Sequence, residues 1–562
     1  MKKVPLAASI PFAIGGIPMK WMEESTLVKM ARASVANDRV LIILQMHGGN
    51  DGLNTLIPVE AYDQYYSKRA NIAIPSKNQL RGFIPLDSTL ASDAQVGLHP
   101  DMLDMKDMYD RGRVTFVQGV SYKNNNGSHF RGRDIWFMGG SYDEYLQSGW
   151  VGRYLEKEFA PKEYPKDFPN PEMPDPLAIE MGNDVSLIFH QQDNIPTSIS
   201  LNDPEAFAEL VGELEGFIDE EVDPRGLPPT FLNPSPYYQE LDWILSLEDK
   251  TKDYAAKLLE RFVAGGTNSV SYPETYPLNA PKGSLRNPLS PQLKLVARLL
   301  AGGCKTKVFL VKIGGFDTHA EQVESSNPTM GSHAALLYHI SSAMKSFQDD
   351  LKARGLEDSV LTLTTSEFGR RIYSNGSFGT DHGTGGPMFI FGRGVQPGVV
   401  GKVPDLTNNN VEMQYDYRII YGNIMRDWML AGDTDADQKL DEKFPGLMTT
   451  GVDGQPFVEL PLASQVITGS DEFISSRFGL DNCYPNPAKD RTTMHFRINR
   501  ATNVTINLLD VSGKQLKVLL SGNYNEGVHK IDVDLTGLQA GNYIYQLKSG
   551  FFQSAKQLTI KK

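Results

Sequence analysis

The feature that most constrains the fold is a continuous apolar run at residues 38–46 (DRVLIILQM), followed directly by His47 and two glycines. Such a run, rich in β-branched residues and without polar alternation, is typical of a strand buried on both faces. Similar runs occur at residues 114–118, 307–312 and 359–365, and segments of helical periodicity separate them. Strand, helix and strand in this order require crossover connections. The sequence therefore predicts an α/β fold with a mainly parallel sheet sandwiched by helices.

The predicted domains follow from where this pattern changes. The α/β domain spans residues 38–465, and an insertion at about 160–290 has proline-rich connections and helical stretches near 204–219 and 237–264. A linker at 466–483 leads to a C-terminal domain at 484–562. Short alternating strands between glycine turns predict a small antiparallel β-sandwich there. Its expected strands are 503–509, 529–535, 542–548 and 555–560.

Charge, cysteine content and hydropathy exclude several classes of protein. The formal net charge of −13 opposes nucleic-acid binding. Only Cys304 and Cys483 are present, which excludes a disulfide framework. No apolar run approaches the ~20 residues of a membrane span, so no integral membrane segment is expected. Residues 1–37 begin with two lysines and an apolar run, which predicts a signal or leader-like segment, with a buried N-terminal segment as the alternative.

Polar side chains follow the ends of four predicted strands, where open parallel sheets place their ligand sites. The first strand is followed by Asp51 in a glycine-rich turn, and the second by Ser128 and His129 at the start of a helix. Carboxylates and imidazoles after successive strands favour one shared site, which could hold a divalent cation. The third and fourth strands are followed by Asp317, His319, Glu367, Asp381 and His382.

Two of these positions also have ordinary structural explanations. Asp51 lies in an Asn-Asp-Gly sequence that is common in turns. Ser128 stands where a helix N-cap belongs. A hydroxyl there is also well placed as a nucleophile, since the helix dipole stabilises developing negative charge.

Six blocks of the sequence, HGGNDGLNTLIP, GLHPDM, NGSHFRGRDIW, GGFDTHAEQ, TSEFGRRI and GTDHGTGGPMFIFG, resemble the DUF1501 family over residues 39–432. That family is related to the alkaline phosphatase and sulfatase superfamily, whose members hydrolyse phosphate or sulfate esters with one or two metal ions and a hydroxyl nucleophile. The resemblance implies an alkaline phosphatase-like fold and Ser128 as the nucleophile, with His129 and Arg131 as further catalytic residues. The implied metal ligands are Asp51, Asp317, His319, Glu367, Asp381 and His382.

One departure from the superfamily pattern leaves two functions open. Glu367 and Phe368 stand where the superfamily has Asp-His, so one metal has lost a nitrogen ligand unless His129 or Asp381 replaces it. The first hypothesis is a metal-dependent hydrolase of a small-molecule or glycan sulfate or phosphate ester, with zinc, calcium or magnesium bound. The alternative is a catalytically silent surface metal- or ligand-binding protein of the same fold. Trp136 and Trp150 could line a sugar cleft or belong to the core.

The last 80 or so residues carry a separate resemblance. YPNP at residue 484, VSGK at 511 and LQAGNY at 538 resemble the type A C-terminal sorting domain of the type IX secretion system. The resemblance implies export through the periplasm of a Bacteroidota-type cell, recognition by the type IX secretion machinery, and a secreted or cell-surface location. Without it, the same segment would suggest a small basic β-sandwich for adhesion, because it carries eleven Lys and Arg against five Asp and Glu.

Overall fold

The computed structural model describes residues 39–207, 253–431, 435–463 and most of 479–561, with a few single positions outside these ranges. The leader segment expected at 1–37 and the linker lie almost wholly outside the described residues, as do the greater parts of the two helices expected near 204–219 and 237–264. The expected domain boundaries therefore stay predictions.

A nine-stranded sheet forms the centre of the α/β domain. Its middle strands pair in parallel, and the strands predicted at 114–118, 307–312 and 359–365 are β7, β10 and β11. β14 alone runs antiparallel, between β11 and β7. The mainly parallel α/β fold is therefore confirmed. The order is β15 (Gly398–Val400), β7 (Val114–Ser121), β14 (Gly386–Phe391), β11 (Val360–Thr365), β3 (Val40–Met46), β10 (Val308–Ile313), β8 (Ala178–Met181) and β9 (Ser198–Leu201), with β16 (Tyr415–Asp416) beside β7.

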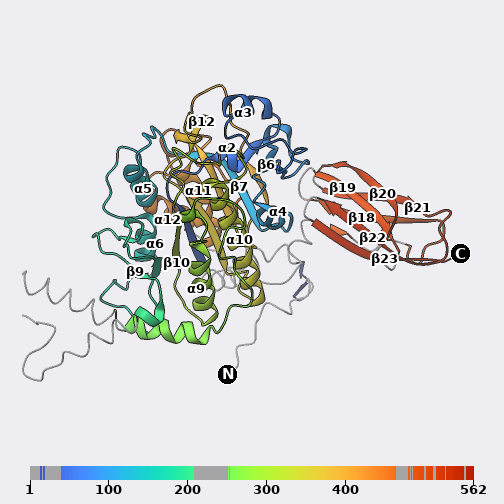
Figure 1. Ribbon diagram of the computed structural model, residues 1–562. Helices are drawn as coiled ribbons and strands as arrows, with labels where there is room; N and C mark the ends of the chain where they lie inside the picture. Colours follow the sequence, from blue (N-terminus) through green and yellow to red (C-terminus); the bar gives the residue numbers. More distant parts are fainter. Residues whose placement is uncertain are drawn as a thin grey trace, which may run out of the picture.

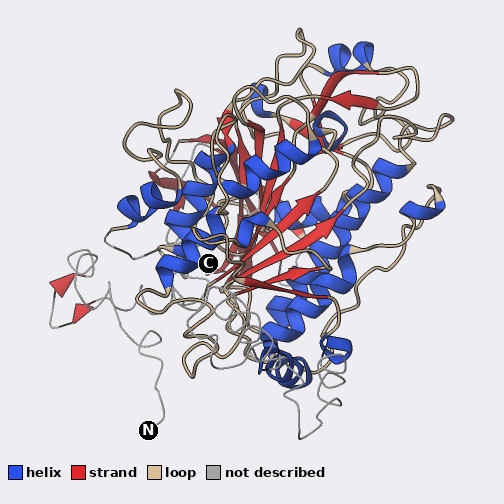
Figure 2. Ribbon diagram, turned by 90° about the vertical axis from the view of Figure 1, so that its left-hand side faces the viewer, coloured by secondary structure: helices blue, strands red, loops and turns tan. Residues whose placement is uncertain are grey.

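Helices cover both faces of this sheet (Figure 2). Along β3, Leu41 and Ile43 join one apolar core while Ile42 and Leu44 join the other, because successive side chains of a strand point to opposite faces. This double burial explains why the strand is apolar throughout. One face packs on α5 (His129–Met138), α6 (Trp150–Glu158), α11 (Tyr417–Ile424) and α12 (Ala436–Lys443), and the other on α4 (Leu103–Asp110), α9 (Leu289–Ala301) and α10 (Ser332–Ala353).

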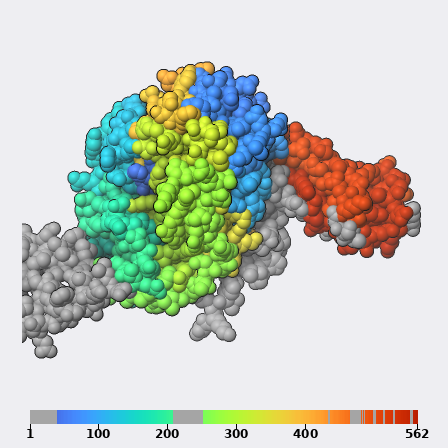
Figure 3. All heavy atoms as spheres, in the orientation of Figure 1, coloured from blue at the N-terminus to red at the C-terminus, as the bar shows by residue number. Residues whose placement is uncertain are grey.

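Small elements gather at the carboxyl end of the parallel strands. Arg69, at the end of α3, donates a hydrogen bond to the Ile372 carbonyl in β12, which joins two segments 303 residues apart. Figure 1 places α2, α3 and β12 at the same end of the domain, and in Figure 3 the blue and orange surfaces adjoin there. These elements are α2 (Gly52–Thr55), α3 (Tyr62–Lys68), the hairpin β12 (Arg370–Ser374) and β13 (Thr380–His382), and the sheet of β4 (Leu56–Pro58), β6 (Val96–Leu98) and β5 (Ile84–Pro85).

The C-terminal domain consists of two antiparallel sheets around its own apolar core. The predicted antiparallel β-sandwich is therefore confirmed, and all four expected strands are present. β17, β18 and β20 were not expected. In β20, Leu516 and Val518 are exposed, so this strand shows no clean apolar alternation. One sheet is β17 (Gly479–Leu480), β18 (Arg491–Ile498) and β21 (Gly527–Asp534), and the other is β20 (Gln515–Tyr524), β19 (Thr502–Leu509), β22 (Gly541–Ser549) and β23 (Phe552–Ile560).

Two expectations outside the site are decided by burial and helix length. Trp136 and Trp150 are 3% and 1% exposed and belong to the core between the sheet and α5, so neither lines a cleft. Among the described residues, no helix combines the length and hydropathy needed to cross a membrane.

Candidate metal centre

Three imidazoles converge on the carboxylate of Asp317 at the carboxyl end of the sheet. The Nε2 atoms of His319 and His382 lie 3.2 and 3.3 Å from Asp317 Oδ1, and Nε2 of His129 lies 3.4 Å from Oδ2. The Nε2 atoms of His319 and His382 are 2.8 Å apart. Asp317 and His319 follow β10, His129 begins α5 after β7, and His382 ends β13. The structure therefore brings together residues from three separate strand ends.

An oxygen lies near the other ring nitrogen of each imidazole, within hydrogen-bond distance for His382 and slightly farther for His319 and His129. Nδ1 of His382 lies 2.7 Å from the Gly127 carbonyl, and since a carbonyl only accepts, this Nδ1 carries a proton. Nδ1 of His319 lies 3.6 Å from Asp381 Oδ1, and Nδ1 of His129 lies 3.8 Å from Glu367 Oε1. Metal-bound histidines usually have such an acceptor behind them, because it orients the ring and leaves Nε2 free.

Three of these four side chains, His129, Asp317 and His382, are close enough together to hold one metal ion. One ligand atom each from His129, Asp317 and His382 lies within 4.8 Å of the others. Zinc–nitrogen bonds of 2.0–2.1 Å place tetrahedral ligand atoms about 3.3 Å apart, close to the three distances to Asp317. Both ring nitrogens of His129 are buried without a hydrogen-bond partner. An ion would satisfy a polar group that is otherwise costly to bury.

Two glycines after β3 allow the strand ends to approach one another. Gly48 and Gly49 have φ values of 120° and 83°, which disfavour other residues. A Cβ atom on Gly48 would lie 2.3 Å from the Asp317 backbone nitrogen, and one on Gly49 would lie 2.5 Å from the Phe368 ring. A side chain at either position would push Asp317 or Phe368 away from the cluster.

Two side chains of the cluster, Asp317 and His382, have shifted pKa values. Partial burial raises the pKa of Asp317, but the hydrogen bond and the positive charge of Arg370 outweigh it and hold the pKa at about 2. Burial lowers the pKa of His382 below its usual value. At neutral pH both side chains therefore have the protonation state that a metal ligand needs.

Asp51 lies outside this cluster, in a buried ion pair. Its carboxylate accepts hydrogen bonds from Arg69 Nη1 at 2.7 Å and from Gln322 Nε2 at 2.6 Å. Burial would raise the pKa of Asp51, but Arg69, His333 and Gln322 together lower it. These partners occupy the carboxylate that the sequence predicted as a metal ligand. Nothing near Asp51 in the sequence signalled Arg69 or Gln322, which are 18 and 271 residues away.

Ser128 and Arg131 make local contacts around α5. Ser128 is the N-cap of α5, and its hydroxyl accepts a hydrogen bond from the Arg131 backbone nitrogen at 3.3 Å. The capping interpretation of Ser128 is confirmed. The Arg131 guanidinium donates to the carbonyls of Tyr142 and Glu144 and lies 3.9 Å over the Tyr145 ring. Its hydrogen bonds thus hold the loop after α5, and its role toward a substrate stays a prediction.

Glu367 is almost completely buried behind His129. It accepts hydrogen bonds from the Gly48 backbone nitrogen at 2.9 and 3.2 Å, and His47 Nε2 lies 3.3 Å from Oε1. The Phe368 ring centroid is 4.8 Å from that of His129 and 4.3 Å from that of His382. Glu367 therefore faces Nδ1 of His129 while Asp317 faces Nε2, and Phe368 packs against two imidazoles. The contact of His47 with Glu367 was not predicted.

A buried histidine outside the cluster, His333, makes the stability of the fold depend on pH. His333 in α10 donates from Nε2 to Asn50 Oδ1 at 3.0 Å, and burial lowers its pKa to about 4. Between pH 6.5 and 4 the unfolded chain binds a proton at His333 that the folded chain does not. We therefore expect the free energy of unfolding to fall by up to roughly 3 kcal/mol over this range. Urea unfolding of metal-free protein should show a weaker pH dependence in His333→Gln, and an unchanged dependence would contradict this assignment.

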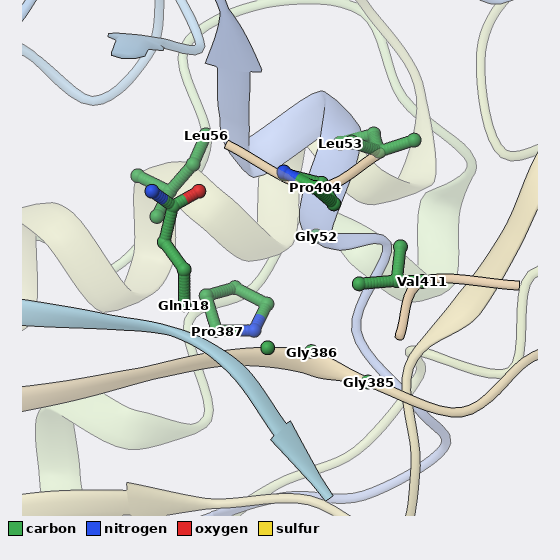
Figure 4. A pocket seen from close by; sticks show the side chains of 10 residues that line it. Gly52, Leu53, Leu56, Gln118, Gly385, Gly386, Pro387, Pro404 and Val411 are labelled. Atoms are coloured by element: carbon green, nitrogen blue, oxygen red, sulfur yellow. The ribbon is translucent and has the colours of Figure 1, made fainter. Parts of the chain in front are cut away.

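A small cavity near the cluster is lined by glycines and apolar side chains. Figure 4 shows Gln118 beside Gly386 and Pro387 at this cavity, whose volume of about 20 Å³ suits about one water molecule. Nε2 of Gln118 is buried without a hydrogen-bond partner. None of the cluster residues lines the cavity, so it is no part of the candidate metal centre.

Comparison with known proteins identifies two segments. Residues 276–434 match the family described as "Protein of unknown function (DUF1501)", and residues 482–561 match "Secretion system C-terminal sorting domain". The chain carries a DUF1501 segment and a secretion sorting domain. The DUF1501 segment contains Asp317, His319, Glu367, Asp381 and His382. The sorting domain makes the chain a secreted or cell-surface protein, handled by secretion machinery.

Several solved structures are similar to the chain at low identity. PsFucS1 sulfatase from Pseudoalteromonas sp. is 12% identical, with a TM-score of 0.31, over 92% of this chain and 88% of that one. Alkaline phosphatase from the Antarctic bacterium TAB5 is 12% identical, with a TM-score of 0.25, over 64% and 94%. Latent PorU from Porphyromonas gingivalis is 23% identical, with a TM-score of 0.13, over 15% of this chain and 9% of PorU. None of the curated proteins matches the sequence.

Proposed function

We propose that the chain is a secreted metal-dependent hydrolase acting on a sulfate or phosphate ester. The observation that supports the proposal most is the convergence of three Nε2 atoms on Asp317, each from an imidazole with an oxygen behind its Nδ1. The sequence blocks resemble the DUF1501 family, and the relation of that family to a superfamily of ester hydrolases suggests the reaction class.

The ligand chemistry favours zinc over calcium or magnesium. In the proposed set, His129, His319 and His382 contribute nitrogen and Asp317 contributes oxygen. Calcium and magnesium prefer oxygen ligands, whereas zinc is commonly held by histidine together with a carboxylate. Glu367 and Asp381, which the sequence suggested as direct ligands, would then act from behind by orienting His129 and His319.

The residues of the centre divide the proposed chemistry between them. A bound zinc ion lowers the pKa of a coordinated water or hydroxyl and polarises the ester oxygen. Ser128 directly precedes His129, and its hydroxyl is half-buried at the N-terminus of α5, where negative charge is stabilised. We propose this hydroxyl as the nucleophile, with the ester's leaving oxygen opposite it.

The second candidate function is metal binding without catalysis. Two contacts favour it: the Ser128 hydroxyl already caps α5, and the Arg131 guanidinium is bound to two carbonyls and a tyrosine ring. A surface protein that holds zinc needs neither a free nucleophile nor a free cation.

Replacing Ser128 separates the two functions. We expect Ser128→Ala to keep its metal and to lower turnover of an aryl sulfate or aryl phosphate about a thousand-fold or more. Loss of the cap should cost about 1 kcal/mol of stability. Ser128→Asn is the matched control, because asparagine restores capping without a nucleophile, and it should be equally inactive. Wild-type turnover in both variants would exclude Ser128 as the nucleophile, and wild-type protein with stoichiometric metal and no turnover of either ester would favour binding alone.

A further inference from the structure

Arg370 is a cation beside the candidate metal centre, and its side chain is fully buried. Its Nε donates to the Gly49 carbonyl at 2.9 Å and its Nη1 to the Thr380 carbonyl at 2.9 Å. Its Nη2 contacts the Gly48 carbonyl, the Phe316 carbonyl at 3.0 Å and Asp317 Oδ1 at 2.7 Å. All three guanidinium nitrogens are therefore occupied within the protein, so Arg370 does not offer a free fork to an anionic substrate.

The acceptors of Arg370 belong to the loops that carry the cluster. Gly48 and Gly49 follow β3, Phe316 and Asp317 follow β10, and Thr380 lies two residues before His382 in β13. Arg370 itself follows Glu367 by three residues. One planar group thus fixes the relative positions of three strand ends and of the hairpin.

The contact with Asp317 also selects how this carboxylate faces the imidazoles. Oδ1 accepts from Arg370 and faces His319 and His382, which leaves Oδ2 toward His129. The Asp317 side chain is 47% exposed, so it would be free to rotate without this bond. The glycine carbonyls can reach the guanidinium because Gly49 lacks a Cβ atom, which would lie 3.3 Å from Arg370 Nε.

We propose that Arg370 is a positioning residue that presets the metal-binding geometry of Asp317 and His382 before an ion arrives. The inference rests on the proposed metal centre and adds to it a residue outside the ligand set. A lysine cannot replace the fork, because its single ammonium cannot reach carbonyls on three loops at once.

Zinc affinity measured on the full chain tests this role. We expect Arg370→Gln to weaken zinc binding about 10- to 100-fold, as substitutions of residues that hydrogen-bond a metal ligand do. The zinc affinity of Arg370→Lys should lie between those of the wild type and Arg370→Gln. Arg370→Lys keeps the buried cation and so provides a folded variant for the measurement. In the cobalt-loaded variants, the visible absorption bands should also shift, since the ligand geometry changes.

The matched control is Arg354→Gln. Arg354 makes a similar but partly buried set of contacts, to Asp350 and to the carbonyls of Gly265 and Thr267, at the end of α10. This control should lower the urea midpoint of unfolding. It should change zinc affinity by no more than about twofold, because a residue outside the ligand set affects the metal only through contacts with the ligands. Equal zinc affinity in wild type and both Arg370 variants would overturn the role of Arg370 but leave the proposed metal centre standing. Wild-type protein that binds no zinc would remove the metal centre and the inference with it.

Discussion

His382→Ala is expected to abolish stoichiometric metal binding and reduce ester turnover to background. The substitution removes one Nε2 that faces Asp317 and also the hydrogen bond that anchors the ring to the Gly127 carbonyl. The affinity for zinc should fall by more than the roughly 100-fold that follows from replacing a residue that only hydrogen-bonds a ligand. Elemental analysis after gel filtration and chelator competition would measure the loss.

His190→Ala serves as the control for this substitution. His190 bonds Asn194 within one loop, 2.7 Å away, and has no contact with the cluster among the described residues. It should leave the metal content and affinity unchanged. A His382→Ala protein with wild-type affinity would show that the convergence of imidazoles is structural and has no part in ion binding.

The second large effect is expected at the buried pair of Asp51 and Arg69. Both side chains are at most 1% exposed, and Arg69 also donates to the Ile372 carbonyl. Arg69→Ala leaves the Asp51 carboxylate buried without its cation, which should cost about 3–5 kcal/mol of stability. Urea unfolding followed by tryptophan fluorescence reports this domain selectively, because all five tryptophans lie before residue 484.

An exposed arginine provides the comparison. Arg133 lies 3.8 Å from Asp134, and both side chains are about 40% exposed. Arg133→Ala should therefore change stability by less than about 0.5 kcal/mol. If Arg69→Ala were as mild as Arg133→Ala, the buried pair would not hold this end of the sheet together.

The sequence predicted most of the architecture, because its signals are local. The apolar run of β3 is explained by burial on both faces, and the strand ends carry the polar residues that the parallel topology then gathers. β14 runs antiparallel, which periodicity cannot reveal, since strand direction depends on pairing partners far along the chain.

The sequence indicated several of the side chains that come together at the candidate metal centre, but not which of them contact each other. Asp317, His319 and His382 are brought together as expected, and His129 joins them. Glu367 and Asp381 lie behind imidazoles, and Asp51 lies in an ion pair with Arg69. The spacing along the sequence shows which side chains lie near a strand end. It does not show which imidazole nitrogen faces which carboxylate, because that depends on contacts between residues far apart in the sequence.

Anomalous diffraction from crystals of the full chain grown with zinc tests the central claim most directly. The account predicts one strong peak bounded by the Nε2 atoms of His129, His319 and His382 and by the carboxylate of Asp317. Zinc-containing crystals without a peak among these four side chains would contradict it.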